Sequence, residues 1–233
     1  MESQERERTA AALERYRPPY DLTADMLVVP VLCPTAPLRQ TFPRVPFLSV
    51  GGKTPLVLWF SRITHACYRD AAGERRCEGD GEPPLYKELT IVVLLRQRAL
   101  FVPSIYATSE RTIRIGHRYG MPKQPTLMHL QVHSTRFEAS MIDGARESFV
   151  RARLLGRGVG VAPIVSRLWP RQMWPACFPA GTQVRAVIQA TPRVQVAHVE
   201  AGQLSVDAAW LPDAVPLLPV GLYLPRLRMR LPP

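Results

Sequence analysis

The sequence contains very little lysine. Of its 233 residues 30 are basic, and only Lys53, Lys87 and Lys123 are lysines, which leaves 27 arginines. The chain therefore uses arginine where it needs a generic surface cation. A retained lysine is more often needed for its amine, because an amine can lose its proton and become a nucleophile whereas a guanidinium cannot. Lys53 follows two glycines in a turn-like stretch, and we expect it to be an ordinary surface residue.

Long apolar runs are also missing. The longest unbroken aliphatic run is Ile91 to Leu95, far short of the roughly 20 residues that a membrane-spanning helix needs. The first residues, MESQERER, are too charged for a secretory signal. A content of 46% hydrophobic and 21% charged residues is typical of a globular protein. These features predict a soluble, cytoplasmic protein with no membrane partner.

Acidic residues are scarce relative to basic ones, 19 against 30, and the net charge is +11. Such a charge would favour phosphate backbones if it were clustered. The arginines are instead scattered from Arg6 to Arg230, with no run longer than Arg75-Arg76 and no helix-turn-helix pattern. We therefore expect no nucleic-acid partner, and a milder attraction of small anions.

Four cysteines are present, with no C-x-x-C pair and no histidine at zinc-finger spacing. This excludes the common sequence patterns of structural zinc and of thioredoxin-like redox sites, and we predict no metal. Cys67 and Cys77 flank a charged, glycine-containing stretch that could be a hairpin tip. We nevertheless expect reduced thiols there, because disulfides are rare in cytosolic proteins.

The chain is divided by 24 prolines into short apolar segments, which makes long helices scarce. A helix is predicted for Glu2 to Arg17, so that residues 1–20 form a helical lead-in and residues 21–233 a single β-rich domain. Many strands at short spacing, without βαβ alternation, favour an antiparallel sandwich or barrel. The predicted strands are Leu56 to Ile63, Glu88 to Leu95, Ala99 to Tyr106, Thr126 to His133, Arg136 to Ile142, Ser148 to Leu155, Thr182 to Ala190, Val194 to Glu200 and Leu204 to Trp210.

Turn signals support this pattern. Asp143-Gly144 predicts a hairpin between its flanking strands, and Ala201-Gly202 predicts another between the last pair. Val165 to Trp174 is the one later stretch that could be helical. Gly156 to Gly160 resembles a phosphate loop, but no helix follows it, so we interpret it as a bend or bulge. His129 and His133 share a strand face without a third ligand, which indicates surface histidines.

Tyr86 and Glu88 stand out because strand alternation places both side chains on one face. The rest of that strand is apolar, so a carboxylate and a phenol would lie beside hydrophobic surface. Taken alone, Glu88 could equally be an exposed residue at the end of an edge strand.

Lys123 lies between two prolines in Met121-Pro122-Lys123-Gln124-Pro125. Proline fixes its own φ and pushes the preceding residue towards an extended conformation. The lysine therefore sits on a stiff, non-helical backbone, which suits a group that must be aimed. Its apolar neighbours Met121, Leu127 and Met128 are of the kind that favours an uncharged amine.

Tyr86-x-Glu88, followed by Gly120-Met121-Pro122-Lys123, resembles the signature of the acetoacetate decarboxylase family in order and spacing. The similarity extends more faintly to a hairpin at Phe137 to Leu154 and to a closing Pro216 to Val220. The resemblance implies a mainly β (α+β) fold, a single-domain antiparallel cone-like β-barrel with a short N-terminal helix and few other helices. It also implies a homo-oligomer that requires no metal or organic cofactor.

The same resemblance implies an enzyme, a lyase that decarboxylates a small β-keto acid through a Schiff base on Lys123, with Glu88 as acid/base or orienting carboxylate. Tyr86, Arg118, Tyr119, Met121 and Gln124 become candidate substrate-binding residues. Two alternatives stay open. One is an aldolase-dehydratase that uses the same lysine on pyruvate or another α-keto acid, and the other is a barrel that binds a small ligand without turning it over.

The sequence departs from the family pattern at several points. Gln124 replaces the second lysine of a Lys-Lys pair, and Tyr119 replaces a tryptophan. The strand Leu56 to Arg62 carries no acid, although a further pocket glutamate is usual there. Arg39 or Arg44 could bind a substrate carboxylate, His117 could contact a second carbonyl, and Tyr223 could supply a pocket hydroxyl. These changes favour a substrate other than acetoacetate.

Overall fold

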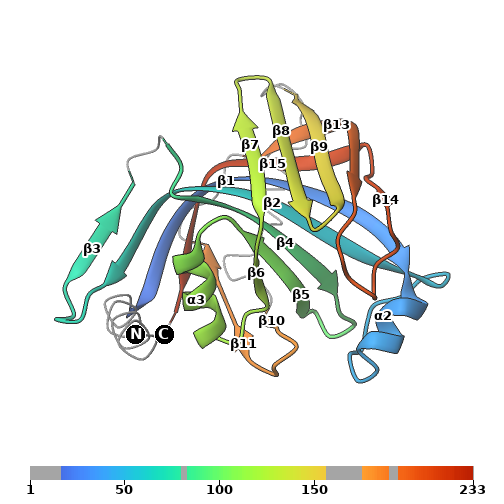
Figure 1. Ribbon diagram of the computed structural model, residues 1–233, viewed down its shortest axis with the longest axis horizontal. Coiled ribbons are helices and arrows are strands. Elements are labelled where there is room, and N and C mark those ends of the chain that lie inside the picture. Colours follow the sequence, from blue (N-terminus) through green and yellow to red (C-terminus); the bar gives the residue numbers. More distant parts are fainter. Residues whose placement is uncertain (1–16, 80–82, 156–174, 189–193, 233) are drawn as a thin grey trace.

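One strongly curved sheet organises the molecule (Figure 1). The computed structural model describes residues 17–79, 83–155, 175–188 and 194–232. Over these ranges the fold is mainly β (α+β), with 15 strands and two helices. The strands follow the path β11-β10-β5-β4-β2-β1-β15-β13-β9-β8-β7. All pairs are antiparallel except those that β5 makes with β6 and with β10.

The elements have the following bounds: β1 Arg17–Pro34, α2 Thr35–Thr41, β2 Lys53–Arg69, β3 Arg75–Glu78, β4 Tyr86–Leu94, β5 Leu100–Ala107, α3 Glu110–Arg118, β6 Lys123–Pro125, β7 Leu127–Val132, β8 Arg136–Asp143, β9 Arg146–Leu154, β10 Ala176–Cys177, β11 Gln183–Val184, β12 Val187–Ile188, β13 Gln195–Leu204, β14 Val215–Pro216 and β15 Val220–Leu231.

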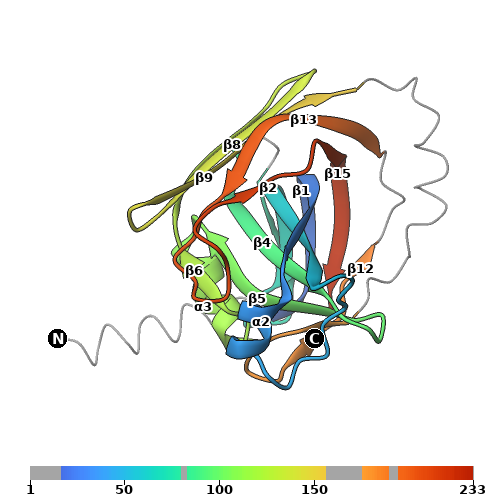
Figure 2. The same cartoon turned by 90° about the vertical axis from the view of Figure 1, so that its right-hand side faces the viewer.

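The main hydrophobic core lies between two halves of this sheet. One wall is formed by alternate residues of the long central strands, such as Leu27, Leu58 and Ile91. The other wall comes from the hairpins β7 to β9 and from β13, which fold over those strands (Figure 2). Burial of this much apolar side-chain surface is the main stabilising contribution to the fold.

The opposite face of the central strands is covered differently. Smaller apolar clusters form there around Trp59, Val102 and Phe178. Figure 1 shows α3, β6, β10 and β11 on this side, away from the hairpins β7 to β9. The central strands thus separate a filled core from a second face on which Lys123 and Glu88 lie.

Seven of the nine predicted strands are confirmed, as β2, β4, β5, β7, β8, β9 and β13, although β2 continues to Arg69, well beyond its predicted end at Ile63. The hairpin at Asp143-Gly144 is also confirmed, since β8 ends at Asp143 and Gly144 has a φ of +59°. The predicted cone-like barrel corresponds to the curved sheet, whose hydrogen-bonded path ends at β11 and β7 within the described ranges.

The predicted hairpin at Ala201-Gly202 was wrong. Strand β13 continues through both residues with a register shift between Val199 and Ala201. Gly202 lies in a closely packed position instead, because a Cβ there would lie 2.7 Å from Cδ1 of Leu217 and 3.0 Å from the carbonyl oxygen of Phe149. The stretch Leu204 to Trp210 is accordingly not a strand, and Trp210 anchors a turn in the main core.

The long first strand, β1, was not predicted, because the prolines within it were interpreted as ends of short segments. Beyond Val28, β1 pairs with β2 but no longer with β15. Pro30 therefore lies where the strand has a neighbour on one side only, and its missing N–H breaks no hydrogen bond to a second strand. The predicted strand Thr182 to Ala190 is replaced by the two short strands β11 and β12. The predicted helices at Glu2 to Arg17 and Val165 to Trp174, and the glycines 156–160, lie outside the described residues, except that Arg17 begins β1.

Cys67 and Cys77 form a disulfide across β2 and β3, which corrects the expectation of two reduced thiols. Strand register places the two cysteines directly opposite each other, and local alternation in the sequence does not reveal that register. His65 lies beside them, with Nε2 3.2 Å from Sγ of Cys67. No helix within the described ranges is both long and apolar enough to cross a bilayer.

Candidate active site

Strand β4 presents two different faces, as its alternating sequence predicts. Leu89, Ile91 and Val93 point into the main core. Tyr86, Glu88 and Thr90 point to the opposite face and line a cavity there. Lys87 lies on the core side of the strand end, where its Nζ donates to the carbonyl oxygen of Met128 at 3.4 Å.

Lys123 begins strand β6, which runs parallel to β5 with Lys123 opposite Ile105. The backbone N–H of Ile105 donates to the carbonyl oxygen of Pro122 at 3.0 Å. The carbonyl oxygen of Lys123 lies 2.7 Å from Nε2 of His117, so the backbone is held on both sides of the lysine. The stiff backbone expected from the flanking prolines is therefore tied to two neighbouring elements.

Helix α3 determines how closely the lysine side chain can pack. A Cβ on Gly116 would lie 2.6 Å from Cδ of Lys123, which is shorter than any real contact. The missing side chain lets the aliphatic part of the lysine lie against the helix backbone. After α3, Gly120 adopts a φ of +68°, and this left-handed residue redirects the chain towards β6.

Lys123 and Glu88 form a close pair on this face. Nζ of Lys123 lies 2.6 Å from Oε2 of Glu88, and the side chains are only 9% and 16% exposed. Thr90 donates its hydroxyl to Oε1 of Glu88 at 3.1 Å. The ring of Tyr86 lies beside the amine, with its centroid 5.8 Å from Nζ. The pairing brings together an amine and a carboxylate that are 35 residues apart in the sequence.

Tyr86 remains a neutral phenol over the whole physiological range. Burial raises its pKa well above the ordinary value, and repulsion by the Glu88 carboxylate adds to this effect. Tyr20 behaves similarly, since burial and a hydrogen bond with Tyr119 raise its pKa. The rings of these last two residues pack edge to face at 6.1 Å.

Two cavities meet at Lys123. The first, which we call the apolar compartment, has a volume of about 140 Å³ and contains Glu88. Its other lining residues include Met26, Trp59, Val102, Ile105, Phe178 and Met229. The residues that line both cavities are Leu22, Tyr86, Met121, Lys123, Val184 and Leu231.

The second cavity, the tyrosine compartment, has a volume of about 80 Å³. It is lined by Tyr20, Tyr68 and Tyr119 together with Glu78 and Arg111. Arg111, on α3, donates to both carboxylate oxygens of Glu78, at 3.2 and 2.6 Å.

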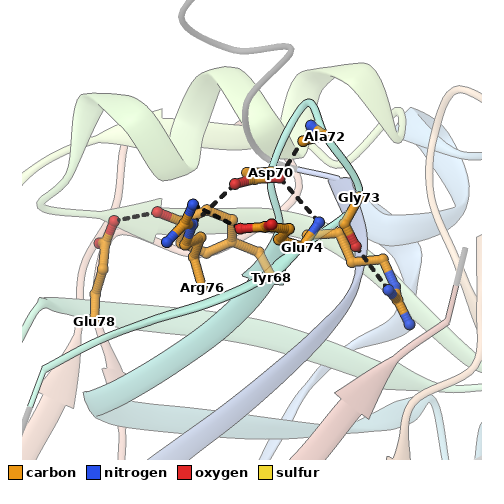
Figure 3. A network of polar contacts seen from close by, with 8 residues as sticks. Tyr68, Asp70, Ala72, Gly73, Glu74, Arg76 and Glu78 are labelled. Atoms are coloured by element: carbon orange, nitrogen blue, oxygen red, sulfur yellow. Dashed lines mark hydrogen bonds and ion pairs between the residues drawn. The ribbon is translucent and has the colours of Figure 1, made fainter.

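Glu78 belongs to the hairpin of β2 and β3. Figure 3 shows this hairpin, with the Tyr68 hydroxyl donating to Oε1 of Glu78 at 2.7 Å. Partial burial raises the pKa of Glu78, but the hydrogen bonds from Tyr68 and Arg111 outweigh burial and lower it overall. At the hairpin turn, Asp70 accepts hydrogen bonds from the N–H groups of Ala72 and Glu74 and fixes the loop.

The remaining sequence candidates lie at varied distances from the pair. Tyr119 and Met121 line the cavities, whereas Arg118 and Gln124 are exposed and line neither of them. Gln124 follows Lys123 on an extended strand and therefore points the other way. Tyr223 packs in the main core, and Arg39 and Arg44 are exposed outside both cavities.

Sequence reasoning missed Glu78, Arg111 and the residues of α3 that line the tyrosine compartment. The helix itself carried a signal, since Ser109 accepts a hydrogen bond from Thr112 N–H as its N-cap and Glu110 follows in the first turn. Glu78 had no comparable signal, because only the pairing of β2 with β3 brings it to the site. His129 and His133 are exposed, as predicted, and no cluster of metal-ligating groups in the described ranges includes them.

No protein-family model matches the sequence, and no curated protein is similar to it in sequence. Solved structures do match the fold. An acetoacetate decarboxylase from Legionella pneumophila aligns over 94% of this chain and 87% of its own, with a TM-score of 0.55 and 14% identity. The chain has an acetoacetate decarboxylase-like fold.

Two further structures support this conclusion. An acetoacetate decarboxylase-like enzyme from Sphingomonas wittichii RW1 covers 91% of this chain and 90% of its own, with a TM-score of 0.53 and 17% identity. The enduracididine biosynthesis enzyme MppR, complexed with the condensation product of pyruvate and imidazole 4-carboxaldehyde, covers 92% and 87%, with a TM-score of 0.55 and 15% identity. The sequence resemblance to the decarboxylase family is thus matched at the level of fold.

Proposed function

We propose that this protein is a Schiff-base lyase of the carboxy-lyase class, which decarboxylates a small β-keto acid through an imine on Lys123. The contact of Lys123 Nζ with Glu88 Oε2, enclosed at the junction of two cavities, carries this proposal. The similarity to acetoacetate decarboxylase structures supports it at the level of fold. Assembly as a homo-oligomer and a cytoplasmic location remain predictions.

The reaction begins with a proton transfer from the Lys123 ammonium to the Glu88 carboxylate, for which the hydrogen-bonded contact is already in place. The free amine adds to the substrate ketone, and loss of water gives an iminium ion. The bond between the α-carbon and the carboxylate then breaks, carbon dioxide leaves, and the electron pair moves to the iminium nitrogen as an enamine. Protonation of the enamine carbon and hydrolysis release the ketone and regenerate the lysine.

The surroundings suit each of these steps. The apolar lining near the amine favours the neutral enamine, which forms from the charged iminium as carbon dioxide leaves. Tyr86, as a permanent phenol, can donate a hydrogen bond to the carbinolamine oxygen without competing for a proton. Gly116 and the backbone contacts of β6 hold the amine in one place, so little reorganisation is needed when substrate binds.

An aldolase-dehydratase that acts on pyruvate or another α-keto acid is the second candidate. The presence of two cavities on either side of Lys123 favours it, because such a reaction must hold two carbonyl compounds at one amine. The structural similarity to MppR is consistent with this chemistry. In both candidates the first covalent step is the imine on Lys123.

Borohydride trapping tests the shared step. The protein is incubated with acetoacetate or pyruvate and reduced, and the adduct is located by peptide mass spectrometry. We expect a single adduct on Lys123, absent from Lys123→Arg and unchanged in Lys53→Arg, which alters an exposed lysine. Release of carbon dioxide identifies the decarboxylase, and a condensation product from pyruvate and an aldehyde identifies the aldolase-dehydratase. A folded protein that forms no adduct with any keto acid would contradict both and support a non-catalytic binding role.

A further inference from the structure

The two compartments at Lys123 are both mainly apolar, but their polar side chains are placed differently, and this placement bears on the substrate. Among the described residues that line the apolar compartment, only Lys123 and Glu88 are charged, and they neutralise each other. The polar side chains Ser61 and Thr90 lie close to Glu88, since Ser61 is opposite Glu88 in the β2–β4 register and Thr90 hydrogen-bonds to it. Away from the carboxylate, the lining is aliphatic and aromatic.

The far end of the apolar compartment is built from side chains that also form apolar clusters with one another. Trp59 packs with Met26 and Met229 on one side and with Val102 and Phe178 on the other. These residues come from β1, β2, β5, β15 and the segment after β10, so the wall is rigid on most sides. A volume of about 140 Å³ exceeds what the single methyl group of acetoacetate would occupy.

The tyrosine compartment has its polar side chains on the side away from Lys123. Among its described lining residues, Arg111 forms an ion pair with Glu78, to which Tyr68 also donates, and Tyr20 and Tyr119 supply further phenolic groups. Hydroxyl-bearing and charged side chains therefore border this cavity, whereas none lies at the far end of the apolar compartment, around Trp59. An apolar substituent on a keto acid bound at Lys123 is therefore best accommodated against Trp59, at the end of the apolar compartment that carries no charged side chain.

We propose that the substrate is a β-keto acid whose ketone carries an extended apolar group, a linear alkyl chain of several carbons or an aromatic ring, seated in the apolar compartment. This inference rests on the proposed function, because it takes the Lys123 imine as the point from which the two substituents diverge. It names the class of substrate that the neutral, apolar cavity selects in place of acetoacetate.

The first experiment compares trapping of β-keto acids that differ only in the ketone substituent: methyl (acetoacetate), propyl, pentyl and phenyl (benzoylacetate). Burial of each added methylene is expected to raise the second-order rate constant for imine formation about fourfold, until the compartment is full. Ala186→Phe, which fills the compartment from the β11–β12 segment, should abolish the preference, so that the longer groups are trapped no better than acetoacetate. Ala72→Phe in the exposed β2–β3 turn is the matched control.

A second measurement does not depend on imine chemistry. Octanoate has the apolar chain and the carboxylate but no ketone, and its binding should quench the fluorescence of Trp59, whereas acetate should not. Trp59→Phe identifies this tryptophan as the source of the signal. Val102→Phe, on β5, provides a second filled cavity and should weaken octanoate binding at least tenfold.

The outcomes separate the two proposals. Adducts on Lys123 that favour pentyl or phenyl groups support both. An adduct of equal or greater yield with acetoacetate, unaffected by Ala186→Phe, overturns the inference and leaves the proposed function standing. Octanoate binding at Trp59 without any adduct overturns the proposed function and supports the ligand class alone. Neither binding nor adduct formation, in a folded protein, overturns both.

Discussion

A Cβ atom on Gly116 would lie 2.6 Å from Cδ of Lys123, so the aliphatic part of the lysine occupies the space that a side chain at position 116 would need. The contact explains why a glycine stands inside α3, where it costs up to about 1 kcal/mol relative to alanine. The absence of a side chain at one position of the helix thereby fixes the place of the amine seven positions later.

Gly116→Ala should therefore impair chemistry more than stability. The methyl group would push the lysine stem away from Glu88, and a misplacement of about 1 Å can lower a rate about a hundredfold. Alanine at the same time favours the helix, so the melting temperature should change little. The rate of borohydride-trapped adduct formation measures the first effect and calorimetry the second. Arg114→Ala on the same helix is the control, and equal trapping rates in both variants would disprove the positioning role.

Glu88→Gln should retain the shape of the side chain but remove the proton acceptor beside Nζ. General acid–base groups contribute about a hundredfold to ten-thousandfold to rate, so adduct formation should slow within that range. Glu147→Gln removes an exposed carboxylate on β9 and should leave the rate unchanged. A Glu88→Gln protein that traps the keto acid at the original rate would show that Glu88 has no part in imine formation.

Glu78 should make the stability of the protein depend on acid pH. Its folded-state pKa lies below the ordinary value of 4.5, because hydrogen bonds from Tyr68 and Arg111 outweigh burial. The associated stability is fully present above pH 4.5 and is lost as the pH falls through the lowered folded pKa. Urea unfolding between neutral pH and the acid range should show a smaller loss of stability in Glu78→Gln than in the unaltered protein. If the free energy of unfolding fell with pH by the same amount in both proteins, Glu78 would not be the source of the acid dependence.

The Cys67–Cys77 disulfide closes a loop with a sequence separation of 10 residues. The chain-entropy model assigns a loop of that size about 2 to 3 kcal/mol of stability. Replacing both cysteines by serine should lower the free energy of unfolding by this amount. Urea unfolding curves of the two proteins, recorded under non-reducing conditions, measure the difference. A dithiol reductant should leave the free energy of unfolding of the double variant unchanged. In the unaltered protein it should lower that free energy by about as much as the substitution does.

The same hairpin carries Glu78 next to Cys77, so the double variant also reports on the tyrosine compartment. Changes in adduct formation that track the loss of stability would indicate that the disulfide fixes the position of Glu78 and, through it, of Arg111 on α3. An unaltered rate would restrict its contribution to stability.

The residues that the sequence identified share one property, which is that local rules govern them. Alternation along β4 placed Tyr86 and Glu88 on one face, and the prolines around Lys123 set an extended backbone whatever the rest of the chain does. The pairing of Lys123 with Glu88 was less secure, because it came from a resemblance and not from the spacing. The two side chains meet in the structure because β6, which carries Lys123, pairs with β5, and β5 pairs with β4, which carries Glu88.

The tyrosine compartment was decided by tertiary structure alone. Arg111 and Glu78 are 33 residues apart, and they meet because β3 pairs back onto β2 while Arg111 reaches Glu78 from α3. A shift of one residue in the register of β3 would turn Glu78 to the other face. Residue identity and neighbours in the sequence thus determined which groups could do chemistry, whereas strand register, a property of the whole sheet, decided which of those groups share a cavity.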